Sequence, residues 1–447
     1  MNAIEKLKNG GGTAIIDKLS HWAGIFTGQR HLTAVRESFV ALMPLIIAAS
    51  LFILVNNVIL NSESGLVGFL GLEGAWIGHV QEIGIRVYSG TLNILAFLAT
   101  LMISYRLANS YGEDGITYAI FALASLFVFF PMGVEVVSPS GEVFSASGLV
   151  SGAEMGATGM FVGIFVALGS VEVFRRVSTN DALKIKMPDT VPPSVARSFN
   201  VLIPMILVLT VFGTIAWALS YFFDVTIHEL VNIMIQTPLQ SALQGLGGLV
   251  TLLLFQNGLW WIGIHGASIT YPIVETTLLV AIQENAQAFA AGIELPHIVT
   301  KPFIDAFGFM GGGGQTIGLL IALWVGAKKS EHRAITKLST PAAVFNINEP
   351  LIFGLPIMFN PILVIPFLLT PIVSVVIAYA ATAMGLIAKT SVIIPWTTPP
   401  VLSSFLATGG DWRAAVLSVI LIAISVVIYM PFVIAMNRQP SVSEVSE

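Results

Sequence analysis

Residues 345–356 read FNINEPLIFGLP and place two asparagines, a glutamate and a proline inside an otherwise apolar run. An ionisable side chain in a membrane segment is costly and by default points to a function. Glu349 directly precedes Pro350, and the residue before a proline is biased away from helical geometry. We therefore expect the helix to stop at Pro350 and to free backbone groups that face a ligand. Alternatively, Glu349 only caps a helix or pairs with a buried cation such as Lys301.

The composition shows that this run belongs to a membrane protein. The 447 residues are 55% hydrophobic and only 10% charged, with a mean hydropathy of +0.86, too few charges for a soluble surface. We predict an all-α polytopic membrane protein with about ten transmembrane helices and two re-entrant hairpins near 299–326 and 341–360. The predicted spans are 38–60, 88–106, 116–137, 155–174, 199–223, 248–265, 361–387 and 414–436, with weaker ones at 66–86 and 226–247.

The distribution of Lys and Arg predicts the orientation, because short basic loops stay in the cytoplasm. We expect both termini in the cytoplasm and no cleavable signal peptide; the family resemblance described below implies that the membrane is a bacterial plasma membrane. The residues that support this orientation are Lys6, Lys8, Lys18, Arg30, Arg36, Arg175, Arg176, Lys184, Lys186, Arg197, Lys328, Lys329, Arg333, Lys337 and Arg438.

Breaks in the apolar pattern divide the chain into regions. The stretch 180–199 contains three prolines and residues of both charges. It is either an amphipathic segment on the membrane surface or a plain solvated connector. The region before it carries glycines (Gly156, Gly159, Gly163 and Gly169) whose spacing favours close helix packing. The predicted regions are a cytoplasmic segment 1–30, a helical scaffold and dimer region 31–177, an amphipathic cytoplasmic linker 178–198, a region 199–436 that contains the broken segments and that the family resemblance described below makes the sugar-binding transport region, and a polar cytoplasmic tail 437–447.

Polar residues gather in the second half, where the helical pattern fails. Irregular backbone at membrane depth is tolerated only inside protein or beside a wet cavity, so the two broken segments suggest a binding site built from half-helices. Asn257 and Asn348 lie at these interruptions. Lys301 and Asp305 are four residues apart, which favours either an internal ion pair or direct substrate contact.

His265 and the tryptophans have two interpretations each. His265 lies between two glycines in GIHG, and either orients substrate hydroxyls or is satisfied by a backbone carbonyl. Trp260, Trp261 and Trp396 either offer flat apolar faces to a sugar ring or belong to an interfacial aromatic belt.

Several other chemistries lack their motif. No cysteine occurs in the sequence, and the seven histidines show no metal-ligand spacing. The GGGG run at 311–314 is not followed by Lys-Ser or Lys-Thr, so it is not a phosphate-binding loop. We expect no metal, no cofactor and no nucleic-acid partner.

Four separated motifs resemble one family. They are KMPDTVPPSVARSF at 186–199, GIHG at 263–266, KPFIDAFGFMGGGGQTIGL at 301–319 and NINEPLIFGLPIMFNP at 346–361. Together they are similar to the membrane subunit, IIC, of the lactose/cellobiose/diacetylchitobiose family of the bacterial sugar phosphotransferase system.

This resemblance implies a transport mechanism. In the family, IIC binds an extracellular sugar, moves it across the membrane and presents its 6-hydroxyl for phosphorylation by a cysteine on IIB. Glu349 then corresponds to the carboxylate that binds the 6-hydroxyl, as an orienting group or a base, and His265 to its partner. Trp260 and Trp396 fall near aromatic positions of the sugar site. The family forms homodimers through its N-terminal helices, and a chain without cysteine requires separate IIB and IIA proteins, for which the basic loops offer a docking surface.

The resemblance favours a β-linked disaccharide such as cellobiose or diacetylchitobiose. Two other functions use the same residues: an ion-coupled sugar carrier in which Glu349 and Asp305 are protonated in each cycle, and an intramembrane lipid-modifying enzyme with His265 and Glu349 as acid and base.

Overall fold

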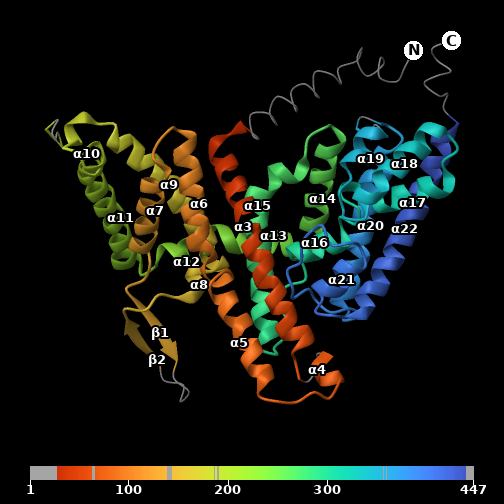
Figure 1. The fold of residues 1–447 in the computed structure, drawn as a ribbon, viewed down its shortest axis with the longest axis horizontal. Helices are drawn as coiled ribbons and strands as arrows, with labels where there is room; N and C mark the ends of the chain where they lie inside the picture. Colours follow the sequence, from red (N-terminus) through yellow and green to blue (C-terminus); the bar gives the residue numbers. More distant parts are fainter. Residues whose placement is uncertain are drawn as a thin grey trace, which may run out of the picture. The chain divides into compact units, whose positions relative to one another are not determined.

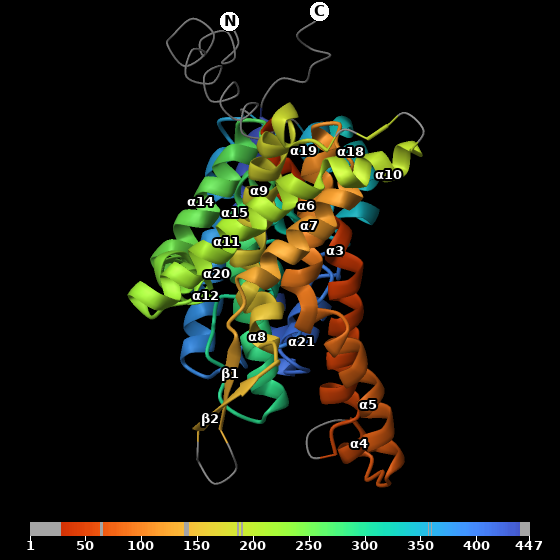
Figure 2. The ribbon, with the colours of Figure 1, turned by 90° about the vertical axis from the view of Figure 1, so that its left-hand side faces the viewer.

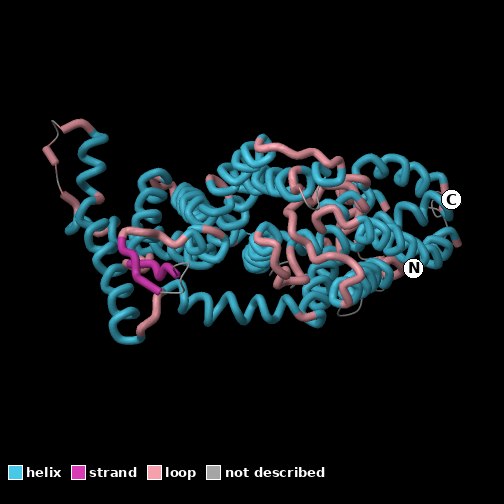
Figure 3. Tube along the Cα trace, turned by 90° about the horizontal axis from the view of Figure 1, so that it is seen from below, coloured by secondary structure: helices cyan, strands magenta, loops and turns pink. Residues whose placement is uncertain are grey.

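The structure is a computed structural model that describes residues 28–62, 66–137, 143–185, 187–188, 191–355, 357–358 and 360–438. The predicted residues Lys6, Lys8, Lys18 and Lys186, and the tail from residue 439, lie outside the described residues. Helices dominate the described chain, and a single two-stranded sheet interrupts them (Figure 3). The chain forms two compact units. The scaffold unit consists of residues 28–46 and 88–239, and the hairpin unit consists of residues 1–27, 47–87 and 240–447.

The scaffold unit is built on helices α6 (Leu95–Ser110), α7 (Gly115–Val128), α9 (Met160–Ser178) and α11 (Leu202–Phe223), which lie side by side (Figure 1). The predicted role of Gly163 is confirmed, because a Cβ there would lie 2.6 Å from Thr100 Oγ1 on the facing helix. A Cβ on Gly169 would meet nothing within 4 Å, so its role in close packing stays a prediction. The unit's other elements are η2 (Leu92–Ile94), α8 (Gly152–Met155), η3 (Ala157–Gly159), η4 (Asp181–Leu183), α10 (Pro193–Asn200), α12 (Ile227–Val231) and η5 (Asn232–Gln236).

An antiparallel hairpin of β1 (Gly133–Val137) and β2 (Val143–Ser147) extends from the helical part of the scaffold unit (Figure 2). It corrects the all-α expectation and the predicted span 116–137, because α7 already ends at Val128. The proline at 131 and the glycine at 133 end the helical pattern, and the following GVEVV run is rich in β-branched valine, which favours a strand.

The hairpin unit contains a buried core where α17 (Thr316–Gly326), α18 (Ser330–Ala343), α19 (Glu349–Gly354), α20 (Val364–Ala383) and α22 (Trp412–Asn437) meet (Figure 1). Leu319, Phe367 and Tyr429 are almost completely buried there. The unit's other elements are η1 (Val55–Ile59), α4 (Leu66–Phe69), α14 (Leu246–Trp261), α15 (Gly266–Ala290), α16 (Lys301–Phe307), η6 (Gly313–Gln315) and α21 (Leu402–Ala407). Three helices contain a boundary between the units: α3 (Arg30–Leu54), α5 (Trp76–Ser89) and α13 (Thr237–Gln244).

Among the described residues, six helical segments are long and apolar enough to cross a membrane, or seven if one bent pair counts as a span. The bent pair joins Ile227–Gln244 to Leu246–Trp261 at 88°. The six segments are Arg30–Ile53, Trp76–Ser110, Ala157–Ser178, Leu202–Phe223, Val364–Ala383 and Trp412–Asn437. They establish a polytopic helical membrane protein, while the larger predicted count stays a prediction.

Candidate functional site

The first broken segment (299–326) follows the sequence expectation closely. Thr300 caps α16 by accepting a hydrogen bond from Phe303 N at 3.2 Å, and Pro302 lies in the first turn, where a missing N–H costs nothing. The chain then leaves the helix at Gly308 and re-enters helical structure at Gly313. This break lies in buried surroundings, so its free backbone groups require partners.

The glycines of this break are needed for two reasons. Gly312 and Gly314 have φ of +94° and +71°, in the region that L side chains rarely adopt. A Cβ on Gly314 would lie 2.1 Å from the ring of Phe367, and one on Gly312 would lie 2.5 Å from the side chain of Asn348. The GGGG run is therefore a tightly packed turn.

The second broken segment (330–354) differs from the expected 341–360. Its first helix, α18, ends at Ala343, and the helical path is lost at 344–348 rather than at Pro350. Pro350 lies in the first turn of α19, a position where its fixed φ and missing N–H suit a helix start. The expectation that Pro350 stops a helix was wrong, because a proline ends the helix before it but can equally begin the next one.

Two buried asparagines of the second break bind it to the first break, and a third asparagine, on α14, also bonds the first break. Asn257 Oδ1, on α14, accepts from Gly314 N at 2.7 Å, and Asn348 Nδ2 donates to Gly313 O at 2.8 Å. Asn346 Oδ1 accepts from Gly311 N at 2.7 Å. The three side chains are at most 7% exposed, so each bond supplies a partner that water does not provide. We call this arrangement the asparagine junction.

Trp260 and His265 lie beside the junction. A Cβ on Gly313 would lie 3.2 Å from Trp260, which places the indole against the glycine turn. The Trp260 and His265 rings are 4.4 Å apart between centroids, and His265 is exposed while Trp260 is buried. The neighbouring Trp261 instead donates from Nε1 to Asn360 O at 3.3 Å.

The glycines of GIHG shape this corner. Gly263 has a φ of +86° and ends α14 in the left-handed conformation typical of helix C-termini. A Cβ on Gly266 would lie 2.1 Å from the backbone oxygen of Gln256, so α15 begins in close contact with the preceding helix. His265 is held between these two constrained positions.

Trp396 is joined to the junction through its backbone. Asn346 Nδ2 donates to Trp396 O at 2.6 Å and to Thr398 O at 2.9 Å. The Trp396 side chain is 44% exposed. Its indole is therefore partly open beside a segment whose main chain is fixed.

Glu349 is the first residue of α19 and follows Asn348 directly. Its side chain is half-buried, and within the described part of the chain no hydrogen bond or ion pair engages its carboxylate. Lys301, the cation suggested as its partner, pairs elsewhere. An acid in the first turn of a helix also interacts favourably with the helix dipole, although α19 is short.

Lys301 and Asp305 form the internal ion pair that their spacing favours. Lys301 Nζ lies 2.6 and 2.5 Å from the two Asp305 oxygens, and both residues are buried. The ammonium also lies 5.2 Å from the centroid of the Tyr271 ring. No hydrogen bond in the described chain joins this pair to the asparagine junction. The ion pair lies on α16, whereas the asparagines bond the glycine turn that follows it.

Further polar residues complete the turn but were not identified from the sequence. Tyr429 Oη donates to Gly314 O at 2.6 Å, and Ser374 Oγ donates to Gln315 Oε1 at 2.7 Å. Both lie inside long helices of mostly apolar residues, Tyr429 in α22 and Ser374 in α20. Only the fold places them beside the glycine turn.

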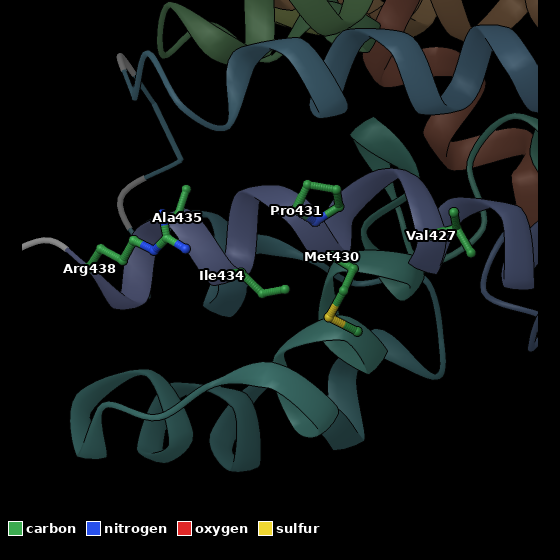
Figure 4. A pocket seen from close by; sticks show the side chains of 6 residues that line it. All are labelled: Val427, Met430, Pro431, Ile434, Ala435 and Arg438. Atoms are coloured by element: carbon green, nitrogen blue, oxygen red, sulfur yellow. The ribbon is translucent and has the colours of Figure 1, made fainter.

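A surface hollow elsewhere on α22 has a different character. It is lined by the apolar side chains Val427, Met430, Pro431, Ile434 and Ala435, and Arg438 lies at one end (Figure 4). A sugar site requires several convergent polar groups, which this hollow lacks. The asparagine junction, with its neighbouring tryptophans, histidine and carboxylate, carries polar and aromatic groups of the kinds that a sugar site uses.

The fold and this site define a polytopic membrane protein in which broken helices assemble a polar site. The family model "Phosphotransferase system, EIIC" matches residues 36–371. The lichenan permease IIC component of Bacillus subtilis is 35% identical over 95% of this chain and 93% of its own. The cellobiose-specific EIIC component of Geobacillus stearothermophilus is 35% identical over 96% and 94%.

A solved structure agrees with these relatives. The crystal structure of ChbC, the IIC component from the N,N'-diacetylchitobiose-specific phosphotransferase system, matches with a TM-score of 0.86 at 32% identity, over 96% of this chain and 97% of that one. The chain therefore belongs to the EIIC family of the sugar phosphotransferase system, which confirms the resemblance of its motifs.

Proposed function

We propose that this permease binds a β-linked disaccharide, cellobiose or diacetylchitobiose, beside the asparagine junction, carries it across the membrane and presents its 6-hydroxyl to a separate IIB protein. The observation that carries this proposal is the Glu349 carboxylate, half-buried and without a partner in the described chain, next to the asparagine junction. The relatives named for cellobiose and diacetylchitobiose support the choice of sugar.

Each residue has a role that its surroundings support. The Glu349 carboxylate accepts a hydrogen bond from the 6-hydroxyl, and the exposed His265 imidazole binds a second hydroxyl. The Trp260 and Trp396 rings face the apolar side of a pyranose. Asn257 and Asn348 shape the site from behind, because their amides are already engaged by the glycine turn.

Phosphorylation requires a donor from another protein. The sequence contains no cysteine. In the family the phosphoryl donor is a cysteine on IIB, which receives the phosphoryl group from IIA. With IIB docked, Glu349 orients the 6-hydroxyl and accepts its proton as the phosphoryl group arrives, an assistance that typically contributes about 10²–10⁴-fold. The basic cytoplasmic loops offer IIB a docking surface.

The wider arrangement is part of the same proposal. The broken segments near 299–326 and 341–360 are re-entrant hairpins, about ten helices span the membrane, and both termini face the cytoplasm. Two copies associate through region 31–177, while region 199–436 holds the sugar and 178–198 links the two along the inner membrane surface.

A sugar panel tests the proposed activity. Membranes containing this protein are mixed with purified IIB, IIA and the general phosphocarriers, and phosphoenolpyruvate-dependent sugar phosphate is measured for each disaccharide. Product is expected with cellobiose or diacetylchitobiose and only when IIB is present. Accumulation of unmodified sugar in vesicles without phosphocarriers would instead support an ion-coupled carrier.

Glu349→Gln tests the site. The amide keeps the shape but loses a charged acceptor, and a hydrogen bond to a charged group is worth about 1.5–3 kcal/mol. We expect weaker sugar binding and no sugar phosphate, with an intact oligomer by size-exclusion chromatography. Glu73→Gln, an exposed glutamate in a loop, is the matched control; wild-type product from Glu349→Gln would remove Glu349 from the site.

A further inference from the structure

Asn346 is the one residue of the asparagine junction that also reaches the segment carrying Trp396. Its Oδ1 accepts from Gly311 N at 2.7 Å, while its Nδ2 donates to Trp396 O at 2.6 Å and Thr398 O at 2.9 Å. The orientation of the amide is fixed by chemistry, because a backbone N–H only donates and a carbonyl only accepts. Both amide hydrogens and one face of the oxygen are thus in use.

The backbone of Asn346 is specialised for this position. Its φ is +63°, a left-handed conformation that asparagine tolerates better than most residues. Asn346 N donates to Ala343 O at 3.1 Å and closes the end of α18. The side chain, 7% exposed, is therefore aimed from a fixed helix end rather than from a mobile loop.

The segment that receives these bonds turns at Trp396 after a buried stretch, 391–394. Thr398 N donates to Pro395 O at 2.9 Å, which closes a short turn around the tryptophan. The Trp396 ring itself is 44% exposed, so packing restrains it only in part. The two bonds from Asn346 attach this turn to the glycine turn of the first broken segment.

We infer that Asn346 is a positioning residue for sugar recognition, which holds the Trp396 turn against the glycine turn and so presents the indole face to the sugar ring. This inference rests on the proposed function only for the role of Trp396 in binding; the tether itself is independent of it. Because a ring-stacking contact depends on orientation, loss of the tether should reduce sugar affinity through Trp396 and not through a general loss of structure.

Asn346→Asp separates the two contacts. Aspartate keeps the oxygen that accepts from Gly311 N but places an acceptor against the carbonyls of Trp396 and Thr398. Asn360→Asp is the matched control, because the Asn360 side chain only accepts, from Ile362 N at 2.9 Å and Leu363 N at 3.3 Å, and aspartate keeps both bonds. Asn346→Ser is the second variant, since a hydroxyl is too short to reach all three partners.

The experiment is a double-mutant cycle on cellobiose or diacetylchitobiose binding in detergent, whichever the panel identifies. We expect Asn346→Asp to weaken binding about tenfold in the presence of Trp396, but less than about twofold in a Trp396→Ala background. Equal losses in both backgrounds, or no loss in the first, would overturn the inference. If Asn346→Asp yields no monodisperse protein, the same cycle is run with Asn346→Ser.

Hydrogen exchange without sugar gives the second readout. Asn346→Asp should accelerate exchange in residues 392–401 while leaving the 308–315 turn as protected as in wild type. If exchange accelerates but Trp396→Ala leaves affinity unchanged, the tether stands and Trp396 is removed from the proposed sugar site. If exchange in 392–401 does not change, the inference fails whatever happens to binding.

Discussion

The scaffold unit and the asparagine junction of the hairpin unit satisfy their buried polar groups in opposite ways. In the scaffold unit the hydroxyls of Thr100, Ser104 and Ser125 donate to carbonyls four residues earlier in their own helices. In the junction, Asn257, Asn346 and Asn348 bond backbone atoms between 35 and 57 residues away in sequence. Asn257 Nδ2 also donates to Leu253 O in its own helix, so its oxygen alone makes the long-range bond. An intact helix satisfies its own backbone, whereas a broken one must obtain partners from elsewhere.

A buried polar residue therefore has one of two roles here: it bonds the backbone of its own intact helix, or it bonds the free backbone groups of a break. A hydroxyl that bonds its own helix can be replaced by a methyl group, because the carbonyl keeps its helical partner. An amide that bonds a break cannot, because its loss leaves a buried backbone group unpaired. The same asparagines that hold the break together therefore determine where Trp260, Trp396 and Glu349 lie.

The largest effect is expected from Gly314→Ala. The substitution forces a left-handed residue, which costs roughly 1–2 kcal/mol, and places a Cβ 2.1 Å from the Phe367 ring, where overpacking costs about 1–3 kcal/mol. We expect a large fall in the thermal midpoint and loss of sugar binding. Gly385→Ala is the control, since its φ is also +71° but nothing lies within 4 Å; equal falls for both variants would show that packing at the junction contributes nothing.

A smaller effect is expected from Asn257→Leu, which tests the comparison directly. The change leaves Gly314 N–H buried without its partner, at a cost of about 1–3 kcal/mol. Thr100→Val in the scaffold unit removes a 2.8 Å bond to Ala96 O and should cost less than about 1 kcal/mol. Thermal midpoints measured by size-exclusion chromatography after heating should rank the two in this order, and a reversed ranking would contradict the distinction.

Sugar affinity gives an effect of intermediate size. If Trp396 stacks on the ring, Trp396→Ala should weaken binding of all accepted β-linked disaccharides by similar factors, about two- to thirteenfold for an aromatic contact of about 0.5–1.5 kcal/mol. His265→Ala should instead penalise sugars according to their hydroxyls. The test is binding of cellobiose and its 6-deoxy analogue. An interfacial Trp396 predicts unchanged affinity, and a structural His265 predicts the same 6-hydroxyl penalty with and without the imidazole.

The sequence predicted the first broken segment well because its signals are local. Glycines in a row and a proline behind a threonine require that geometry wherever they occur. The second segment was misplaced because Pro350 is compatible with both the end and the start of a helix. The partners of the first break, Tyr429 and Ser374, lie far along the chain in mostly apolar helices. The 25-residue helix α15 is missing from the predicted spans, because glutamate, glutamine and asparagine interrupt its apolar run.

The smallest effect is expected at Asp411, where a carboxylate bonds both its own helix and a distant break. It accepts from Arg413 N at 3.0 Å as the cap of α22, and from Ala388 N at 2.7 Å in the loop after α20. Burial alone would raise the pKa of Asp411, but hydrogen bonds from the Arg413 side chain and from these two backbone N–H groups hold that pKa below its ordinary value.

A lowered folded-state pKa means that the ionised Asp411 contributes stability above its unfolded pKa of about 3.9, and that this contribution is lost as the pH falls through the lower, folded pKa. Asp411→Asn keeps one oxygen for the cap but turns an NH2 group towards Ala388 N, which loses its bond. Because Ala388 is only half-buried, we expect a cost of about 1 kcal/mol at neutral pH. The difference in thermal midpoint between wild type and Asp411→Asn should therefore shrink as the pH is lowered from about 5 to about 2.5, through and below the unfolded pKa. Asp224→Asn, an exposed aspartate of the scaffold unit at the end of α11, provides the control for general acid effects. A difference that is constant across this range would show that the charge of Asp411 does not stabilise the fold, and that its two backbone bonds act as those of a neutral side chain would, like the bonds of the asparagines.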